Sequence, residues 1–346
     1  MKKMILALCL CAIFAASGCG KNSAVDSKSS SAADSSSQDA VGAMAEIEES
    51  SADETPKETY VNSSVEKVAE EKKPENFDID GNYSFYFDGF DKVYSNEKLK
   101  KAFDKIEKIC DEANFSLSFS YENMDSDVIV FHNTYASYLT CSTIKAPYIK
   151  WILSQDPDLD EVIVRDTCWE GDDGRVALEP NGTKHTVKEL IKYAIQESDN
   201  TAYYLLYRRF GYEGFNELMY SLGANYYLGN SWIFTYCNVL DMAKCYKDIY
   251  EYAEKSKNGK WLTELMQKTD VETQITQALG GKYKVSHKYG SEFNESNFHD
   301  CAIVYADSPF VLCIFTDQMP ETEESCKVFR ELARAFDDVN NLLVTD

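Results

Sequence analysis

The sequence predicts an α/β (α+β) fold in which an antiparallel sheet of about five strands is built from both ends of a folded region. Helices from the N- and C-terminal parts of the region flank this sheet, and an all-helical lobe is inserted between its two halves. Two patterns carry the prediction. Apolar and polar residues alternate with a period of two near each end of the region, which indicates strands. Between these stretches apolar residues recur every three or four positions, which indicates amphipathic helices.

Residues 1–76 differ in composition from the rest of the chain. Two lysines precede an apolar run from Met4 to Ala16, and small residues then lead to Cys19, the pattern of a secretory signal peptide. The stretch resembles a bacterial lipobox, which implies removal of residues 1–18 and a lipid anchor on Cys19, on the outer side of the bacterial cell membrane. An ordinary secretory signal with an incidental cysteine is the alternative. Residues 19–76 are rich in Ser, Ala, Asp and Glu, so we expect a disordered tether there.

Charge and cysteine usage exclude several classes of function. The formal net charge is −23 and the pI is about 4.6, which argues against nucleic acid as a partner and against electrostatic docking on anionic lipid. No Cys-x-x-Cys or His-Glu-x-x-His pattern occurs, so we expect no metal site. Eight cysteines follow the signal segment and are expected to be small buried hydrophobic residues: Cys110, Cys141, Cys168, Cys237, Cys245, Cys301, Cys313 and Cys326.

The folded domain is expected to cover residues 77–346, where aromatic residues become frequent. Asn96 is placed to cap a helix from Glu97 to about Ala113. A half-buried strand is expected from Phe115 to Tyr121, where apolar residues alternate with serines. A second strand, over 128–131, would form a hairpin with it.

The middle of the domain is predicted to be mostly helical. Residues 156–184 are polar and carry glycines and prolines, so we expect loops. Thr186 and Glu189 form a capping box that opens a helix with an apolar stripe up to Ile195. Further helices are expected over 201–210, 212–222, 239–254 and 260–268. The period then returns to two, and strands are expected over 283–289, 301–305 and 310–316, followed by a long helix over 324–343.

Three short motifs carry possible chemistry. Ser142-x-x-Lys145 heads an apolar run, so that a hydroxyl and an amine share one face at a helix start. Residues Ser198–Asn200, a Ser-Asp-Asn triplet, separate two helices, and Lys288–Gly290, a Lys-Tyr-Gly triplet, end a strand. Each has a simpler explanation when taken alone: a helix cap, a turn between helices and a charge on an edge strand. Two further Ser-x-x-Lys matches, at Ser64 and Ser95, fall outside the expected helices.

In this order the motifs resemble the signatures of the serine penicillin-recognising family, which includes class A β-lactamases and low-molecular-weight penicillin-binding proteins. The first two motifs match fully, whereas Tyr289 stands where the family has Thr. The resemblance covers roughly Asn96 to Leu343 and is closest over Thr186–Leu206. It implies the β-lactamase-like arrangement of the fold described above.

The resemblance also implies a role for each motif residue. Ser142 would attack an amide or lactam carbonyl, and a neutral Lys145 would take its proton. Burial and a second cation, supplied by Lys288, would disfavour the charged form of Lys145. Ser198 would relay the proton to the leaving nitrogen. This acyl-serine chemistry needs no organic cofactor.

The remaining motif residues would bind the substrate. Lys288, Tyr289 and Gly290 would line the site, with Lys288 orienting a substrate carboxylate. Asn200 would hydrogen-bond the amide side chain of the substrate, whereas Asp199 would brace its own turn. The backbone N–H groups of Ser142 and Ser291 would form the oxyanion hole. His287 is expected to be a polar strand residue and Cys141 a packed one.

One segment departs from class A β-lactamases. They carry a Glu that directs the deacylating water, and the corresponding segment here, about Gly223–Asp241, contains no Glu. The resemblance therefore implies a cell-surface serine hydrolase acting on a β-lactam or a D-alanyl-D-alanine-type wall peptide, either a slowly deacylating β-lactamase or a D,D-peptidase. A binding module that senses wall fragments or β-lactams, and an esterase, remain alternatives. The sequence does not indicate an oligomeric state.

Overall fold

A computed structural model describes residues 86–87, 96–126, 128–230, 232–272 and 274–344. All of them belong to the second of two units of the chain, Glu58–Asp346. The expected signal peptide, tether and lipid-bearing Cys19 lie outside the described residues, as do Ser64 and Ser95.

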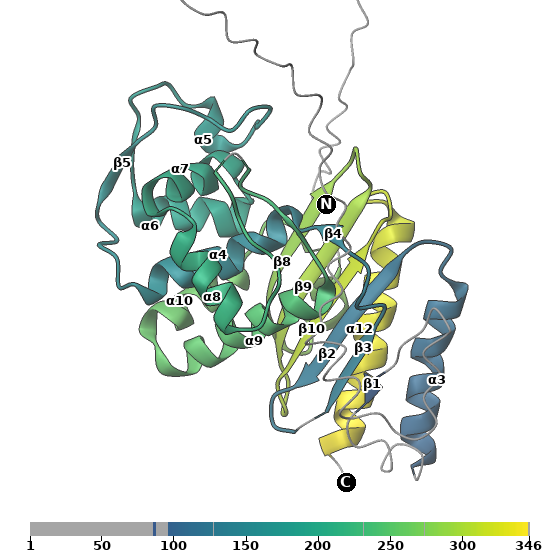
Figure 1. Cartoon of the computed structure of the whole chain (residues 1–346). Helices are drawn as coiled ribbons and strands as arrows, with labels where there is room; N and C mark the ends of the chain where they lie inside the picture. Colours follow the sequence, from purple (N-terminus) through teal and green to yellow (C-terminus); the bar gives the residue numbers. More distant parts are fainter. Residues whose placement is uncertain (1–85, 88–95, 127, 231, 273, 345–346) are drawn as a thin grey trace, which may run out of the picture. The chain divides into compact units, whose positions relative to one another are not determined.

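An antiparallel six-stranded sheet forms the centre of the fold, in the order β1-β3-β2-β10-β9-β8 (Figure 1). β2 lies beside β10, with Tyr121 opposite Leu312, so strands from the two ends of the domain pair directly. This confirms the predicted sheet, to which the two-residue β1 adds a sixth strand. The strands are β1 (Tyr86–Phe87), β2 (Leu117–Asn123), β3 (Ile129–His132), β8 (Lys284–Glu292), β9 (Asn297–Tyr305) and β10 (Phe310–Thr316).

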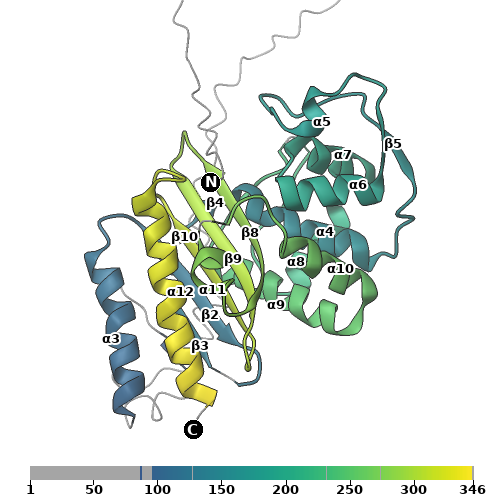
Figure 2. The ribbon, with the colours of Figure 1, turned by 180° about the vertical axis from the view of Figure 1, so that it is seen from behind.

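Helices cover both faces of the sheet. One face packs against α3 (Glu97–Glu112), α11 (Ile275–Leu279) and α12 (Glu323–Val344) (Figure 2). α9 (Val239–Lys255) contacts β2, β9 and β10 on the other face. Because both faces are covered, β2 is buried along almost its whole length, and the prediction of a half-buried strand was wrong. The buried Ser118 is hydrogen-bonded: its hydroxyl donates to the carbonyl of Asn133 at 2.8 Å.

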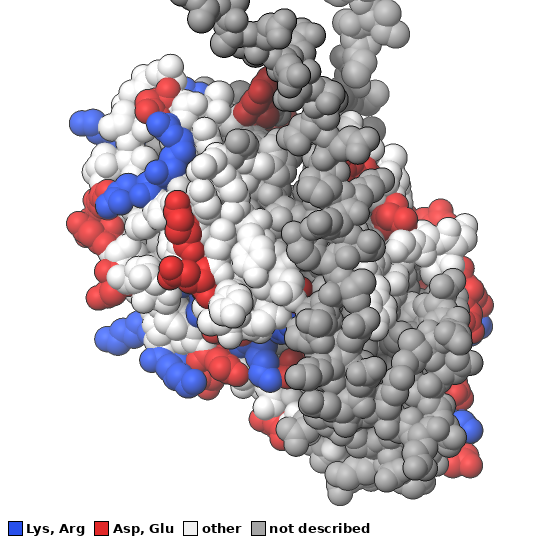
Figure 3. Space-filling model, in the orientation of Figure 1, with Lys and Arg blue, Asp and Glu red and all other residues white. Residues whose placement is uncertain are grey.

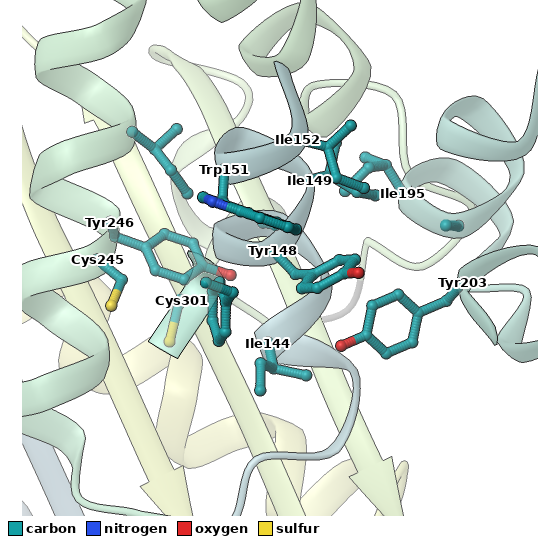
Figure 4. Close-up of a cluster of buried hydrophobic side chains, with 14 of the residues drawn as sticks. Ile144, Tyr148, Ile149, Trp151, Ile152, Ile195, Tyr203, Cys245, Tyr246 and Cys301 are labelled. Atoms are coloured by element: carbon teal, nitrogen blue, oxygen red, sulfur yellow. The ribbon is translucent and has the colours of Figure 1, made fainter. Parts of the chain in front are cut away.

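The helical lobe is built around α4 (Lys145–Ser154), whose first nine residues are buried. Tyr148 of α4 and Tyr203 of α7 meet edge to face, with ring centroids 5.3 Å apart (Figure 4). The Thr186–Glu189 capping box is present as predicted. The other helices of the lobe are α5 (Arg175–Leu178), α6 (Val187–Lys192), α7 (Asn200–Phe210), α8 (Glu213–Ser221) and α10 (Lys257–Met266).

Pro147 lies in the first turn of α4, where its missing N–H leaves the Thr143 carbonyl without a helical donor. The hydroxyl of Tyr246 on α9 donates to that carbonyl at 3.2 Å. A tertiary hydrogen bond therefore replaces the helical one, and α4 is fixed to α9 at the end that carries Lys145.

Short elements account for most differences from the predicted boundaries. The expected loop region includes β5 (Val162–Val164) and β6 (Lys184–Thr186), which pair with each other. β4 (Tyr138–Leu139) and β7 (Tyr236–Cys237) form a second small pair. α10 starts three residues before the predicted 260, because the Ser256 hydroxyl caps it by accepting from the Gly259 N–H.

The eight cysteines from Cys110 to Cys326 are free thiols. Seven of them are buried as expected, whereas the expectation was wrong for Cys168, which is exposed. None of the helices within the described stretches of 86–344 has both the length and the apolar character that crossing a membrane requires. On the face drawn in Figure 3, basic and acidic side chains of the helical lobe are interspersed rather than gathered by sign.

Candidate active site

Ser142 lies in a 3₁₀ turn, η1 (Cys141–Ile144), that leads directly into α4. Its neighbours Cys141 and Thr143 are buried, whereas Ser142 is partly exposed. In a 3₁₀ turn the side chains at positions i and i+3 eclipse, so the turn aligns Ser142 with Lys145. The turn thus leaves Ser142 partly exposed, three residues before the buried Lys145.

Gly290 of β8 packs against this turn. A Cβ atom at Gly290 would lie 2.9 Å from the Cys141 Cβ, 2.9 Å from the Ser142 nitrogen and 3.0 Å from the Thr143 nitrogen. Those distances are shorter than side chains tolerate, so only glycine allows the close approach. The glycine of the Lys-Tyr-Gly motif therefore seats the nucleophile turn against the strand, and it brings the amide of Ser142 beside the backbone expected to supply the second oxyanion donor, Ser291.

Lys145 is the first residue of α4 and is fully buried. Its Nζ donates to the Ser198 carbonyl and to the Asn200 Oδ1, both at 2.6 Å, and lies 3.4 Å from the Ser198 Oγ. Burial lowers the pKa of Lys145 to about 7, against the opposing fields of Asp172 and Asp199. A large fraction of this amine is therefore unprotonated at neutral pH, as a general base requires.

The Ser-Asp-Asn turn is formed by an irregular backbone. α6 runs into a π-turn, η2 (Tyr193–Glu197), which ends at Ser198 in the left-handed region, with φ of 58°. Asp199 then caps α7: its carboxylate accepts from the Ala202 N–H at 2.7 Å and from the Val176 N–H at 2.8 Å. The carboxylate thus holds the turn in place, which is the role expected for it.

Asp172 fixes the next residue of the same turn. Its Oδ2 accepts from the Thr201 N–H at 2.8 Å and from the Thr201 hydroxyl at 2.6 Å. No sequence signal marks Asp172, because it lies in a polar loop with several other acids and its partner carries no motif. Its field acts on Lys145, so it belongs to the electrostatic surroundings of the site.

Ser198 Oγ lies between two buried amines. Lys288 Nζ donates to it at 2.9 Å, and Lys145 Nζ is 3.4 Å away on the other side. A hydroxyl donates one proton and accepts two hydrogen bonds. Because the Ser198 hydroxyl accepts from Lys288, its own proton can be donated to another group, which is the geometry of a relay.

Lys288 is the second amine of the site. It is fully buried, and its pKa is well below the ordinary lysine value because of burial and then the field of Lys145. The chief cause of the low pKa of Lys145 is likewise burial rather than the neighbouring lysine. Burial therefore makes Lys288 a weaker base than an exposed lysine.

Tyr289 contacts the same amine. Lys288 Nζ donates to the Tyr289 carbonyl at 3.1 Å and lies over the Tyr289 ring, 4.5 Å from its centroid. Burial, followed by the fields of Glu321 and Asp270, raises the pKa of Tyr289 to about 12. The phenol is therefore neutral at physiological pH.

A buried network under β8 supports the site strand. His287 Nδ1 lies 2.9 Å from Asp300 Oδ1, and its Nε2 lies 2.6 Å from the Thr269 hydroxyl. Asp300 Oδ2 accepts from the Ile275 N–H at 3.1 Å. The network joins β8, β9 and the segment before α11, so His287 positions the strand that carries Lys288.

The segment Gly223–Asp241 contains a single acid, Asp241. Its carboxylate is buried and accepts from the Asn225 N–H at 3.0 Å and the Asn238 side chain at 3.1 Å, and it pairs with Lys244 at 2.9 Å. These bonds tie the first turn of α9 to the segment that precedes it. The acid of this segment is therefore engaged in holding the fold together.

Comparisons with known proteins identify the family and the fold. The family described as "Beta-lactamase enzyme family" matches residues 98–341, well over half of the chain. A β-lactamase from Sphaerobacter thermophilus aligns with a TM-score of 0.61 at 17% identity, covering 70% of this chain and 98% of that one. A β-lactamase from Chitinophaga pinensis aligns with a TM-score of 0.62 at 19% identity, covering 69% and 99%.

A third solved structure is that of a point mutant of PBP-A in an acyl-enzyme complex with penicillin G. It aligns with a TM-score of 0.59 at 16% identity and covers 68% of this chain and 94% of that one. A search of curated proteins finds no match. At these identities the structural likeness shows the fold, and the family match shows the membership. The chain belongs to the β-lactamase enzyme family and has the fold shared by serine β-lactamases and penicillin-binding proteins.

Proposed function

We propose that the chain is an acyl-serine hydrolase whose nucleophile is Ser142, acting on a β-lactam or a D-alanyl-D-alanine-type wall peptide. One observation carries this proposal above the others. Ser198 Oγ lies between the buried amines of Lys145 and Lys288, and the first of these amines has a pKa of about 7. Two lysines buried around one hydroxyl cost folding free energy and are suited to moving a proton.

The proposed reaction has four steps. Ser142 Oγ attacks the carbonyl carbon while its proton passes to neutral Lys145, and a C–O bond forms. The N–H groups of Ser142 and Ser291 would stabilise the oxyanion of the tetrahedral intermediate. The C–N bond then breaks, and the proton on Lys145 reaches the leaving nitrogen through the Ser198 hydroxyl. Water finally cleaves the acyl ester, which releases the acid and restores the Ser142 hydroxyl.

Deacylation is expected to be slow. The family's deacylating Glu has no counterpart in Gly223–Asp241, and Asp241 is committed to structural hydrogen bonds. The same observation favours a second candidate function, a sensor that holds the acyl group and signals its presence. The lifetime of the acyl-enzyme separates the two.

The test follows the intact mass of the full chain, purified in detergent, during incubation with a reporter penicillin. We expect a shift equal to one penicilloyl group, present in the Ser64→Ala control and absent in Ser142→Ala. Ser64 heads another Ser-x-x-Lys match in the chain, so it is a matched control. An adduct that survives Ser142→Ala would refute the assignment of the nucleophile.

We further propose that Cys19 carries a lipid that anchors the chain to the outer face of the cell membrane, on the signal-like sequence that precedes it. Metabolic labelling with radioactive palmitate in a bacterial host should label the wild-type chain but not Cys19→Ala. Equal labelling of both chains would contradict the anchor.

A further inference from the structure

At Tyr289 the substrate-binding part of the site is unlike a site that binds a carboxylate. An amine in its charged form has three donors. At Lys288 the neighbouring acceptors are the Ser198 Oγ at 2.9 Å, the Tyr289 carbonyl at 3.1 Å and the face of the Tyr289 ring. These three contacts use the donors that a substrate carboxylate would need.

The aromatic ring itself disfavours an anion. The face of an aromatic ring is the negative side of its quadrupole, which attracts cations and repels carboxylates. In addition, burial makes Lys288 a weak base. An amine that is buried, already hydrogen-bonded and covered by a ring provides little attraction for a negative charge.

The charges next to Tyr289 are acidic. Glu321 and Asp270 are the charged groups that raise its pKa. Asp300 is its cross-strand partner on β9, so their side chains share one face of the sheet. A carboxylate bound beside Tyr289 would meet like charges, which cost binding free energy.

Asp270 is held close to the proton relay. Its N–H donates to the Gln196 carbonyl at 2.9 Å, two residues before Ser198. The neighbouring Lys268 carbonyl accepts from the Gln196 side chain at 3.1 Å, and the hydroxyl of Thr269 contacts His287 of β8. The segment 268–270 therefore connects the Ser-Asp-Asn turn with the strand that carries Tyr289.

We propose that Tyr289, with Asp270 and Glu321, makes the subsite beside Lys288 select a leaving group without a carboxylate, so that the preferred substrate is an amide or ester whose leaving group is uncharged next to the scissile bond. This inference rests on the proposed acylation of Ser142 and narrows its substrate class. Free-acid peptides and β-lactams, which carry a carboxylate at this place, would then be slower substrates.

The test compares N-acetyl-D-alanyl-D-alanine with its C-terminal amide as acyl donors for the full chain. We expect kcat/KM for the amide to exceed that for the free acid by about tenfold. In Tyr289→Thr the amide-to-acid ratio should fall at least about fivefold, whereas Tyr289→Phe, which keeps the ring, should retain the wild-type ratio. Asp270→Asn should lower the ratio by a smaller factor and keeps the test valid if Tyr289→Thr fails to fold.

The outcomes separate this inference from the proposed function. A wild-type preference for the free acid, or a ratio unchanged by both Tyr289→Thr and Asp270→Asn, would overturn the inference and leave Ser142 acylation standing. Failure of the peptides and of the reporter penicillin alike to acylate Ser142 would overturn the proposed function as well.

Discussion

Two regions of the molecule use their polar groups differently. The residues assigned to acylation direct them into the candidate site, whereas the segment that would serve deacylation uses its carboxylate for structural hydrogen bonds. Ser142 lies in η1, three residues before Lys145 of α4, and Lys145 is in direct contact with Ser198 of the Ser-Asp-Asn turn. In Gly223–Asp241 the single acid is buried in bonds that close the start of α9. Because acylation and deacylation would depend on separate segments, a protein with this fold can retain the residues for acylation while the segment for deacylation changes.

The largest effect on the acylation rate is expected from removing Lys145, the proposed general base. Lys145→Met keeps the buried volume but removes the amine, so the acylation rate of Ser142 should fall by about 10³-fold. Stopped-flow kinetics with a reporter penicillin measures this rate. Lys192→Met, which changes an exposed lysine near the end of α6, is the control and should leave the rate unchanged. A loss below about threefold in Lys145→Met would assign the base to another group.

A smaller loss is expected at Gly290. Gly290→Ala adds a Cβ 2.9 Å from the Ser142 nitrogen and pushes the nucleophile turn away from β8, so acylation should slow by about 10²-fold. Gly281→Ala is a matched control, because a Cβ there meets nothing within 4 Å. Equal rates in both variants would show that the close approach of β8 and η1 is not needed for catalysis.

The pH profile tests the electrostatics of the residues assigned to acylation. A lysine with a pKa of about 7 is protonated below that pH and neutral above it. The acylation rate should therefore be low near pH 5, rise through about pH 7 and level off above it. A rate independent of pH across this window would mean that Lys145 does not act as the base.

The smallest effect on a reaction rate is expected from a change in the segment Gly223–Asp241. Asp241→Asn should leave the deacylation rate within about twofold of wild type, since Asp241 is assigned a structural role. It should lower the free energy of unfolding by about 1–3 kcal/mol, because a buried hydrogen-bonded carboxylate is replaced by an amide that fits its donors less well. If deacylation stops in this variant, Asp241 is the carboxylate that directs the deacylating water.

Local sequence signals predicted the parts of the site that depend on local chemistry. The capping box at Thr186 and the bracing role of Asp199 are backbone requirements that neighbouring residues specify, and both are present. The order of the three motifs placed Ser142, Lys145, Ser198 and Lys288 in one site, and the structure brings Lys145, Ser198 and Lys288 into direct contact.

Features that depend on tertiary packing were not predictable. The π-turn before Ser198 continues the apolar periodicity of α6, so no change of pattern marks it. The low pKa of Lys288 arises from burial by elements distant in the sequence. The network of His287 and Asp300 joins β8 and β9, and the register of these two strands could not be predicted from the sequence.

The measurement that tests the account most directly is a time course of the acyl-enzyme at Ser142, recorded by intact mass after mixing the full chain with a slight excess of penicillin. The account predicts that one adduct per chain forms quickly and decays at least about 10²-fold more slowly than it forms. It also predicts no adduct in Ser142→Ala. The absence of an adduct together with rapid hydrolysis of the penicillin would show that the deacylation half is intact and would contradict the account.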